Sequence, residues 1–148
     1  MNSTKLFQGI KLLGIDTSPL IYYVAENPQY DKLVTEVFRG FERTEFEIVV
    51  SSLTITEVMS FPVRLGNDKL ANLYYRFLTE TIGIKVVPAN IEVAYKAAIL
   101  RAKYSLKTID AIHLATAIES GCGAFLTNDF IFKRVTEIRV LILDDLQK

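Results

Sequence analysis

The sequence predicts an α/β fold, a three-layer α/β/α sandwich around a parallel, roughly five-stranded sheet. Short apolar segments rich in Val and Ile alternate with longer segments of helical periodicity. That alternation is typical of βαβ units, whose strands pair in parallel. The chain has 148 residues, 50% of them hydrophobic, which is enough to bury a core without disulfides. We therefore expect residues 1–148 to form one domain.

The expected strands are short apolar runs bounded by turn residues. They lie near 11–15, 46–50, 84–87, 123–127 and 139–143. Each run is too short for a helix of ordinary length and is followed by a segment of helical periodicity. The strands therefore order the chain into repeated strand–helix units.

The expected helices fill the intervals. Pro19 suits the first turn of a helix capped by Ser18, and Asn27-Pro28 ends that helix before a second one from about 29 to 43. Phe61-Pro62 and Gly66-Asn67 predict the end of the helix that follows the second strand and the loop before the next helix. Apolar residues spaced three and four apart predict the remaining helices at 68–82, 91–104 and 108–119.

The overall charge argues against binding through a general electrostatic field. Seventeen basic and seventeen acidic residues cancel, so contact with a polyanion has to come from a local patch. The single cysteine, Cys122, cannot form an internal disulfide, and burial as a small apolar side chain is its expected role. No apolar run reaches the roughly 18 residues of a membrane span, and the N-terminus lacks a signal-peptide core. We expect a cytoplasmic protein without a membrane partner.

Acidic residues follow strands, or lie on the next helix, in four places. In an open parallel sheet the ligand crevice lies beyond the carboxyl ends of the strands, so such residues converge there. Asp16 ends the first strand and Glu57 lies on the helix after the second. Asp110 lies in the first turn of the helix at 108–119, and Asp129 follows the fourth strand.

Three of these acids also have a local explanation. Thr54 and Glu57 match a capping box, in which the glutamate reaches back to the helix cap. Asp110 follows a possible cap at Thr108 and suits the positive end of the helix dipole, an effect worth under about 1 kcal/mol. Asp129 suits the cap of a short helix that begins at Phe130, with Asn128 as a rival. Taken singly, these local roles are sufficient.

Asp16 has no evident local task, because Ser18 and Pro19 already provide a cap and a first turn. If the four acids share a crevice, carboxylates about 6 Å apart repel by roughly 3 kcal/mol per pair at an effective dielectric near 20. Protons or a divalent cation relieve that repulsion. Oxygen ligands favour Mg²⁺ or Mn²⁺, and such a centre suits hydrolysis of phosphodiester bonds.

The segments that carry these acids resemble the PIN-domain ribonucleases, and among them the VapC-type toxins of toxin–antitoxin pairs. The matching stretches are "GIDTS" at 14–18, "TEV" at 56–58 and "TIDAIHLATAIESGCGAFLTNDFIFKR" at 108–134. The resemblance covers nearly the whole chain. It implies a ribonuclease dependent on Mg²⁺ or Mn²⁺, a homodimer, and an antitoxin that occupies the active-site groove.

The resemblance also implies residue roles. The catalytic and metal-binding acids of the family fall on Asp16, Glu57, Asp110 and Asp129, and its hydroxyl before the last acid falls on Thr127. Asp16 and Asp110 rank first as direct metal ligands. Thr17 and Thr127 are expected to bind ligand waters or phosphate.

Two further groups near the acids have open interpretations. His113 lies one helical turn beyond Asp110 and could face the crevice, but a packed or rim position is the preferred interpretation. Lys103 and Lys107 lead toward Asp110 and are candidates for holding substrate phosphates, although solvated helix faces are the preferred explanation.

Two rival functions are compatible with the predicted fold. An aspartyl phosphatase would need a second acid two residues after Asp16, and that position is Ser18. A catalytically silent module that binds RNA or protein on the same scaffold is the alternative, which the complete set of acids disfavours.

Overall fold

The centre of the molecule is a parallel sheet with the strand order β3-β2-β1-β4-β5. The computed structural model describes residues 3–147. The strands are β1 (Leu12–Ile15), β2 (Glu47–Ser51), β3 (Ile84–Val87), β4 (Ala124–Thr127) and β5 (Arg139–Ile142). The predicted sheet and the position of each of its strands are confirmed.

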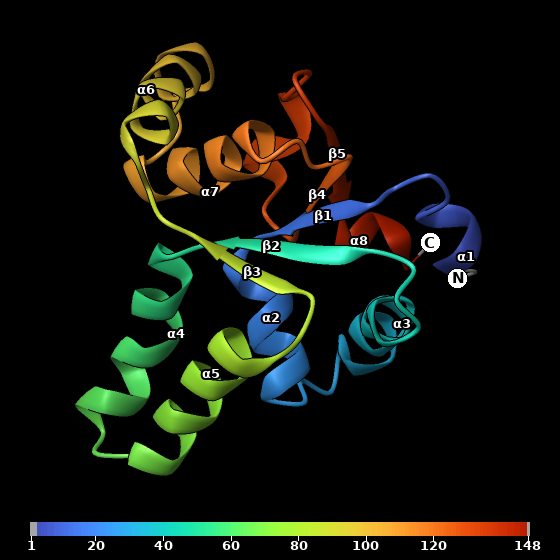
Figure 1. Ribbon diagram of the computed structural model, residues 1–148, viewed down its shortest axis with the longest axis vertical. Coiled ribbons are helices and arrows are strands. Elements are labelled where there is room, and N and C mark those ends of the chain that lie inside the picture. The colour runs from blue at the N-terminus through green and yellow to red at the C-terminus, as the bar shows by residue number, and fades with distance from the viewer. Residues whose placement is uncertain (1–2, 148) are drawn as a thin grey trace.

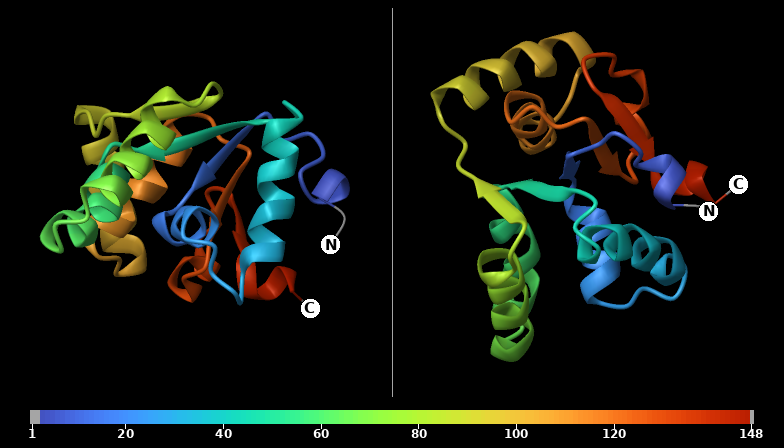
Figure 2. Two further views of the ribbon diagram at one scale, coloured as in Figure 1. Left: turned by 90° about the horizontal axis from the view of Figure 1, so that it is seen from below. Right: turned by 45° about the vertical axis from the view of Figure 1, so that its right-hand side comes forward.

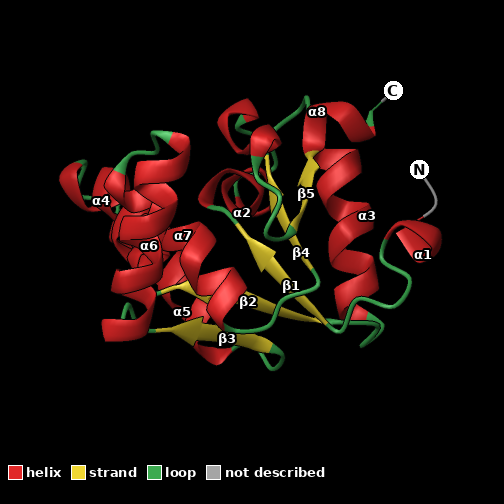
Figure 3. Ribbon diagram, turned by 90° about the horizontal axis from the view of Figure 1, so that it is seen from above, coloured by secondary structure: helices red, strands yellow, loops and turns green. Residues whose placement is uncertain are grey.

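Helices cover both faces of the sheet, which gives the predicted α/β/α layers (Figure 1). One face carries α7 (Thr108–Glu119), with α6 (Ile91–Tyr104) on its outer side (Figures 1 and 3). The other face carries α2 (Thr17–Val24), α3 (Asp31–Glu42), α4 (Leu53–Arg64) and α5 (Asp68–Glu80) (Figures 1 and 2). The short helices are α1 (Ser3–Leu6), the 3₁₀ helix η1 (Phe130–Arg134) and α8 (Leu143–Leu146).

Each face of the sheet has its own apolar core, because side chains alternate along a strand. In β4, Leu126 packs with the helices of the α3 side, whereas Phe125 packs with α6, α7 and η1. Gly14 in β1 lets α7 approach closely: a Cβ there would lie 2.6 Å from the Cβ of Ala117. The position of α7 over the sheet therefore depends on the absence of a side chain at residue 14.

Pro62 does not end the helix after β2 as predicted. That helix, α4, continues to Arg64 with Pro62 buried inside it. Proline removes one backbone donor, but the helix ends only where Gly66 adopts a positive φ of 69°. Among residues 3–147, no helix is long and apolar enough to cross a membrane.

Candidate active site

The predicted site lies at the carboxyl ends of β1 and β4, which are neighbours in the sheet. Asp16 directly follows β1, and its backbone N–H donates to the carbonyl of Leu126 in β4 at 2.9 Å. The chain runs from β1 to β2 on one side, and β4 lies on the other side. Strand order reverses at this point, where open parallel sheets place their ligands.

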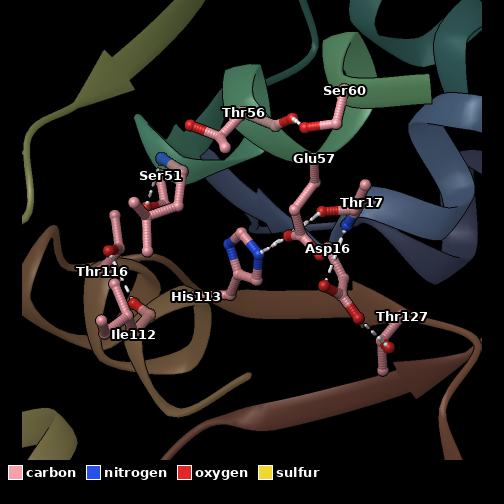
Figure 4. Close-up of polar contacts among 11 residues, drawn as sticks. Asp16, Thr17, Ser51, Thr56, Glu57, Ser60, Ile112, His113, Thr116 and Thr127 are labelled. Atoms are coloured by element: carbon pink, nitrogen blue, oxygen red, sulfur yellow. Dashed lines mark hydrogen bonds and ion pairs between the residues drawn. The ribbon is translucent and has the colours of Figure 1, made fainter. Parts of the chain in front are cut away.

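Asp16 is buried and has both carboxylate oxygens bonded. The residue is 7% exposed. Oδ1 accepts the backbone N–H of Thr17 at 2.9 Å, and Oδ2 accepts the Thr127 hydroxyl at 2.7 Å (Figure 4). Burial raises the pKa of Asp16 above 3.8, although His113 and these hydrogen bonds act in the opposite direction. Hydrogen bonds thus hold the carboxylate in a buried position, where burial disfavours its negative charge.

The prediction that Ser18 caps the first long helix is wrong, because Asp16 caps that helix, α2. The helix begins at Thr17, and the Asp16 side chain accepts the first free N–H. Asp16 therefore has a local role as well as a place in the crevice. The capping role does not explain the bond of its second oxygen, Oδ2, to Thr127 in β4.

Glu57 does not form the predicted capping box. Helix α4 begins at Leu53 with Ser52 at its N-cap, so Thr54 lies inside the helix. The Glu57 carboxylate instead accepts the Thr17 hydroxyl at 2.8 Å and contacts Nε2 of His113 (Figure 4). Glu57 consequently points toward Thr17 and His113 and not toward its own helix cap.

His113 faces the acids. The preferred prediction, that it packs against neighbouring helices or lies at the rim, is therefore wrong. The residue is 3% exposed, and Nε2 lies against Glu57 and 3.4 Å from the Thr17 hydroxyl. A carboxylate only accepts hydrogen bonds, so Nε2 carries the proton. The sequence spacing could have predicted this position. Residues three apart on a helix share a face, and His113 follows Asp110 by three residues.

The bond between His113 and Glu57 shifts both pKa values. The hydrogen bond from His113 lowers the pKa of Glu57 and outweighs burial, which would raise it. Burial opposes charge on His113, but the bond to Glu57 and the negative charge of Asp16 outweigh it, so the pKa of His113 is raised. The two directions agree, and both favour a carboxylate beside an imidazolium.

Asp110 connects the four acids electrostatically. It lies in the first turn of α7, whose N-cap position is Lys107 and not Thr108. Burial raises the pKa of Asp110, and the negative charges of Asp16, Asp129 and Glu57 raise it further. Charges far apart in water would not interact in this way. Asp110 therefore lies within electrostatic range of the other three acids.

Asp129 is exposed and caps η1, as the local interpretation expected. Its side chain accepts the backbone N–H of Ile131 at 3.0 Å, and its own N–H donates to the Thr127 hydroxyl at 3.1 Å. The rival cap Asn128 instead accepts the N–H of Asp144 at 3.0 Å. Thr127 therefore links the buried acid Asp16 to the turn that presents Asp129.

The PIN domain family model matches residues 14–138. That span includes all four acids and the greater part of the sheet. The chain belongs to the PIN domain family. A search of the curated proteins found no match.

Solved structures with the same fold include three at low sequence identity. VapBC2 from Rickettsia felis, bound to a promoter DNA fragment, has a TM-score of 0.69 at 14% identity, over 88% of this chain and 98% of that one. A toxin–antitoxin complex from Klebsiella pneumoniae has a TM-score of 0.63 at 20% identity, over 90% and 97%. VapC20 from Mycobacterium tuberculosis, described as a sarcin-ricin loop cleaving toxin, has a TM-score of 0.66 at 13% identity, over 87% and 99%.

The basic residues of this PIN domain form no ion pair with the four acids in the part of the chain that the structure describes. Lys103 forms an ion pair with Glu137 at 3.5 Å, and Lys107 lies at the N-cap of α7 without a side-chain cap bond. His113 is the basic side chain that contacts the cluster, through Glu57.

The donor set of this PIN domain fits a hard cation that keeps part of its water shell. In the described part of the chain, no three His, Cys, Asp or Glu side chains are arranged to hold a metal ion by themselves. Mg²⁺ commonly takes only one or two carboxylates and retains several waters. Asp16 and Asp110 provide such carboxylates. The thiol of Cys122 is no candidate, because burial raises its pKa to about 12.

Proposed function

We propose that this PIN domain is an endoribonuclease dependent on Mg²⁺ or Mn²⁺, and that it is the toxin of a toxin–antitoxin pair. The observation that supports this most strongly is that Thr17 and Thr127 link Asp16 by hydrogen bonds to Glu57 and to Asp129, while the negative charges of all three acids raise the pKa of Asp110. Like charges held together in a fold cost stability and are typical of functional sites.

The acids divide by their expected task toward the cation. Asp16 and Asp110 would hold it directly, and Glu57 and Asp129 would bind its water ligands or a second ion. When bound, the cation would screen the phosphate, orient a water and lower the pKa of that water. Because His113 lowers the pKa of Glu57, Glu57 is a weak base, which suits a ligand better than a proton acceptor.

The hydroxyls of this chain prepare the site before substrate binds. Thr127 donates to Asp16 and accepts from the backbone of Asp129, so one side chain orients two acids. Thr17 donates to Glu57. Neutral donors that fix carboxylates in this way reduce the reorganisation needed when a cation binds.

The proposed partners are an RNA substrate, an antitoxin and a second copy of the chain. RNA as substrate is supported by the description of VapC20 as a toxin that cleaves the sarcin-ricin loop. An antitoxin is supported by the toxin–antitoxin complex from Klebsiella pneumoniae, which has a similar fold. Exposed apolar side chains on α6 at four-residue spacing would suit a protein partner: Ile91, Tyr95 and Ile99.

The deciding experiment is RNA cleavage with and without Mg²⁺, comparing the native chain with Asp16→Asn. We expect the native chain to cleave RNA only when Mg²⁺ is present. The variant should not cleave RNA in either condition. Asp68→Asn is the matched control, since Asp68 is an exposed acid at the start of α5. Metal-independent cleavage, or full activity of Asp16→Asn, would refute the proposal.

The alternative is a catalytically silent module that binds RNA or protein. A titration with Mn²⁺ separates the two functions. The nuclease should bind Mn²⁺ and lose that binding in Asp16→Asn and Asp110→Asn. A silent module should show no uptake that depends on these two residues.

A further inference from the structure

Two donors converge on one oxygen of Glu57, and from this geometry we infer that His113 is a positioning residue that fixes the Glu57 carboxylate toward the acid cluster. The inference rests on the proposed function, because it assigns a role within that site. It also names a residue that the acid pattern alone does not include.

The donors come from separate parts of the chain. The Thr17 hydroxyl on α2 reaches Oε1 of Glu57 at 2.8 Å, and Nε2 of His113 on α7 contacts the same Oε1 (Figure 4). The other oxygen, Oε2, receives no hydrogen bond from residues 3–147. One oxygen is thus anchored from two sides, and the second is left to bind water or a cation.

Glu57 needs such an anchor more than Asp16 does. Its side chain is 33% exposed and extends from the second turn of α4. Without bonds to hold it, a long carboxylate at a helix surface samples many rotamers. The short side chain of Asp16 is already fixed by bonds to both oxygens. Anchoring therefore converts Glu57 from a mobile surface group into an ordered member of the site.

His113 is held rigidly, so it can fix the position of the Glu57 carboxylate. Its side chain is 1% exposed, and α7 packs against the sheet where Gly14 allows close approach. The ring cannot follow Glu57 outward without disturbing that packing. The groups that face it are Glu57, Asp16, Asp110 and the hydroxyl of Thr17.

The bonding pattern of the ring argues against a purely structural role. Nδ1 is buried and has no hydrogen-bond partner among the described residues. Burying an imidazole with one nitrogen unpaired is unfavourable, and an apolar side chain would fill the space without that cost. The polar contacts that remain are those to the site, so the imidazole is explained by its action on Glu57.

The test compares three substitutions of His113 with two readouts. Gln places an amide nitrogen near the position of Nε2, Asn is equally polar but too short, and Leu retains bulk alone. We expect H113N and H113L to weaken Mn²⁺ binding, measured by electron paramagnetic resonance of the free ion, by about 10- to 100-fold. H113Q should recover most of that affinity. RNA cleavage should show the same order in kcat with smaller changes in KM.

Thr116→Val is the control for general damage to α7. Thr116 is buried on the same helix, but among residues 3–147 its hydroxyl bonds only the carbonyl of Ile112, at 2.7 Å. Thermal unfolding without metal identifies any variant that loses affinity through misfolding. T116V should bind Mn²⁺ as the native chain does.

A double-mutant cycle with Glu57→Gln makes the mechanism specific. If His113 acts through Glu57, H113N should have little further effect on Mn²⁺ affinity in the E57Q background. Independent, additive losses would overturn the inference, as would native affinity in H113N and H113L. Absence of Mn²⁺ binding by the native chain would overturn the proposed function and this inference with it, so the two failures are distinguishable.

Discussion

The inner and outer halves of the acid cluster are built differently. The inner half, Asp16 and Glu57, is hydrogen-bonded by Thr17, Thr127 and His113. The outer half, Asp110 and Asp129, is held mainly by its place at helix starts, and Asp129 is exposed. The inner half is therefore ordered before any ligand arrives. In the outer half, Asp129 accepts one backbone N–H, and no described residue donates a hydrogen bond to the Asp110 carboxylate, so a cation would neutralise charge mainly there.

The largest expected effect is the difference in cleavage activity between a variant of the inner half and a variant of the outer half. We expect Asp16→Asn to lower kcat for RNA cleavage by more than about 10³-fold, because several kcal/mol of transition-state stabilisation depend on holding the cation. Asp129→Asn should cost about 10-fold, since asparagine still caps η1 and the position is exposed. Single-turnover cleavage measures both. Equal losses would show that the two halves act as one unit.

Thr127→Val tests how strongly the inner half is fixed. The substitution leaves Oδ2 of Asp16 and the N–H of Asp129 without their partner, and Thr127 is fully buried. We expect a decrease of about 1–3 kcal/mol in the free energy of unfolding, measured with urea. Thr116→Val, which removes a bond within one helix, should cost less. A cost for T127V no greater than for T116V would contradict a fixed inner half.

The charge of the outer half predicts a dependence of stability on pH. The pKa of Asp110 is raised in the folded state, so its contribution to stability is full below 3.8 and is lost as pH rises through the folded value. Without divalent ions, Asp110→Asn should therefore be more stable than the native chain at neutral pH, by less than about 1 kcal/mol after screening. The two should converge below pH 3.8.

That difference should reverse when the cation is added. Mg²⁺ stabilises the folded native chain by mass action, and the variant should gain less from it. Thermal unfolding with Mg²⁺ and with a chelator measures both effects. A native chain that is more stable than Asp110→Asn in the chelator would mean that the outer half is not strained by its charge.

The smallest expected effect concerns the basic residues beyond the outer half. Replacing Lys103 and Lys107 with Ala should weaken RNA binding and reduce the slope of log K against log salt by about 0.7 for each phosphate that the variant no longer neutralises. Because Lys103 is paired with Glu137, Lys107 should account for more of the change. An unchanged slope for the double variant would exclude both lysines from the substrate path.

The sequence by itself determined the fold and the places of the four acids. Strand and helix positions follow from local periodicity, and parallel strands bring the residues after them to one edge of the sheet. For this reason Asp16, Glu57, Asp110 and Asp129 could be expected together before any coordinates. The cap of η1 at Asp129 also follows from its local sequence.

The tertiary structure decided which atoms meet. Local rules favoured a capping box for Glu57 and a packed ring for His113, but the two side chains bond each other across the crevice. That contact depends on how closely α7 approaches β1, which is set by the small residue Gly14 far away in sequence. Periodicity assigns a residue to a face of its helix, and only the packing of one helix against another element determines the partner it finds there.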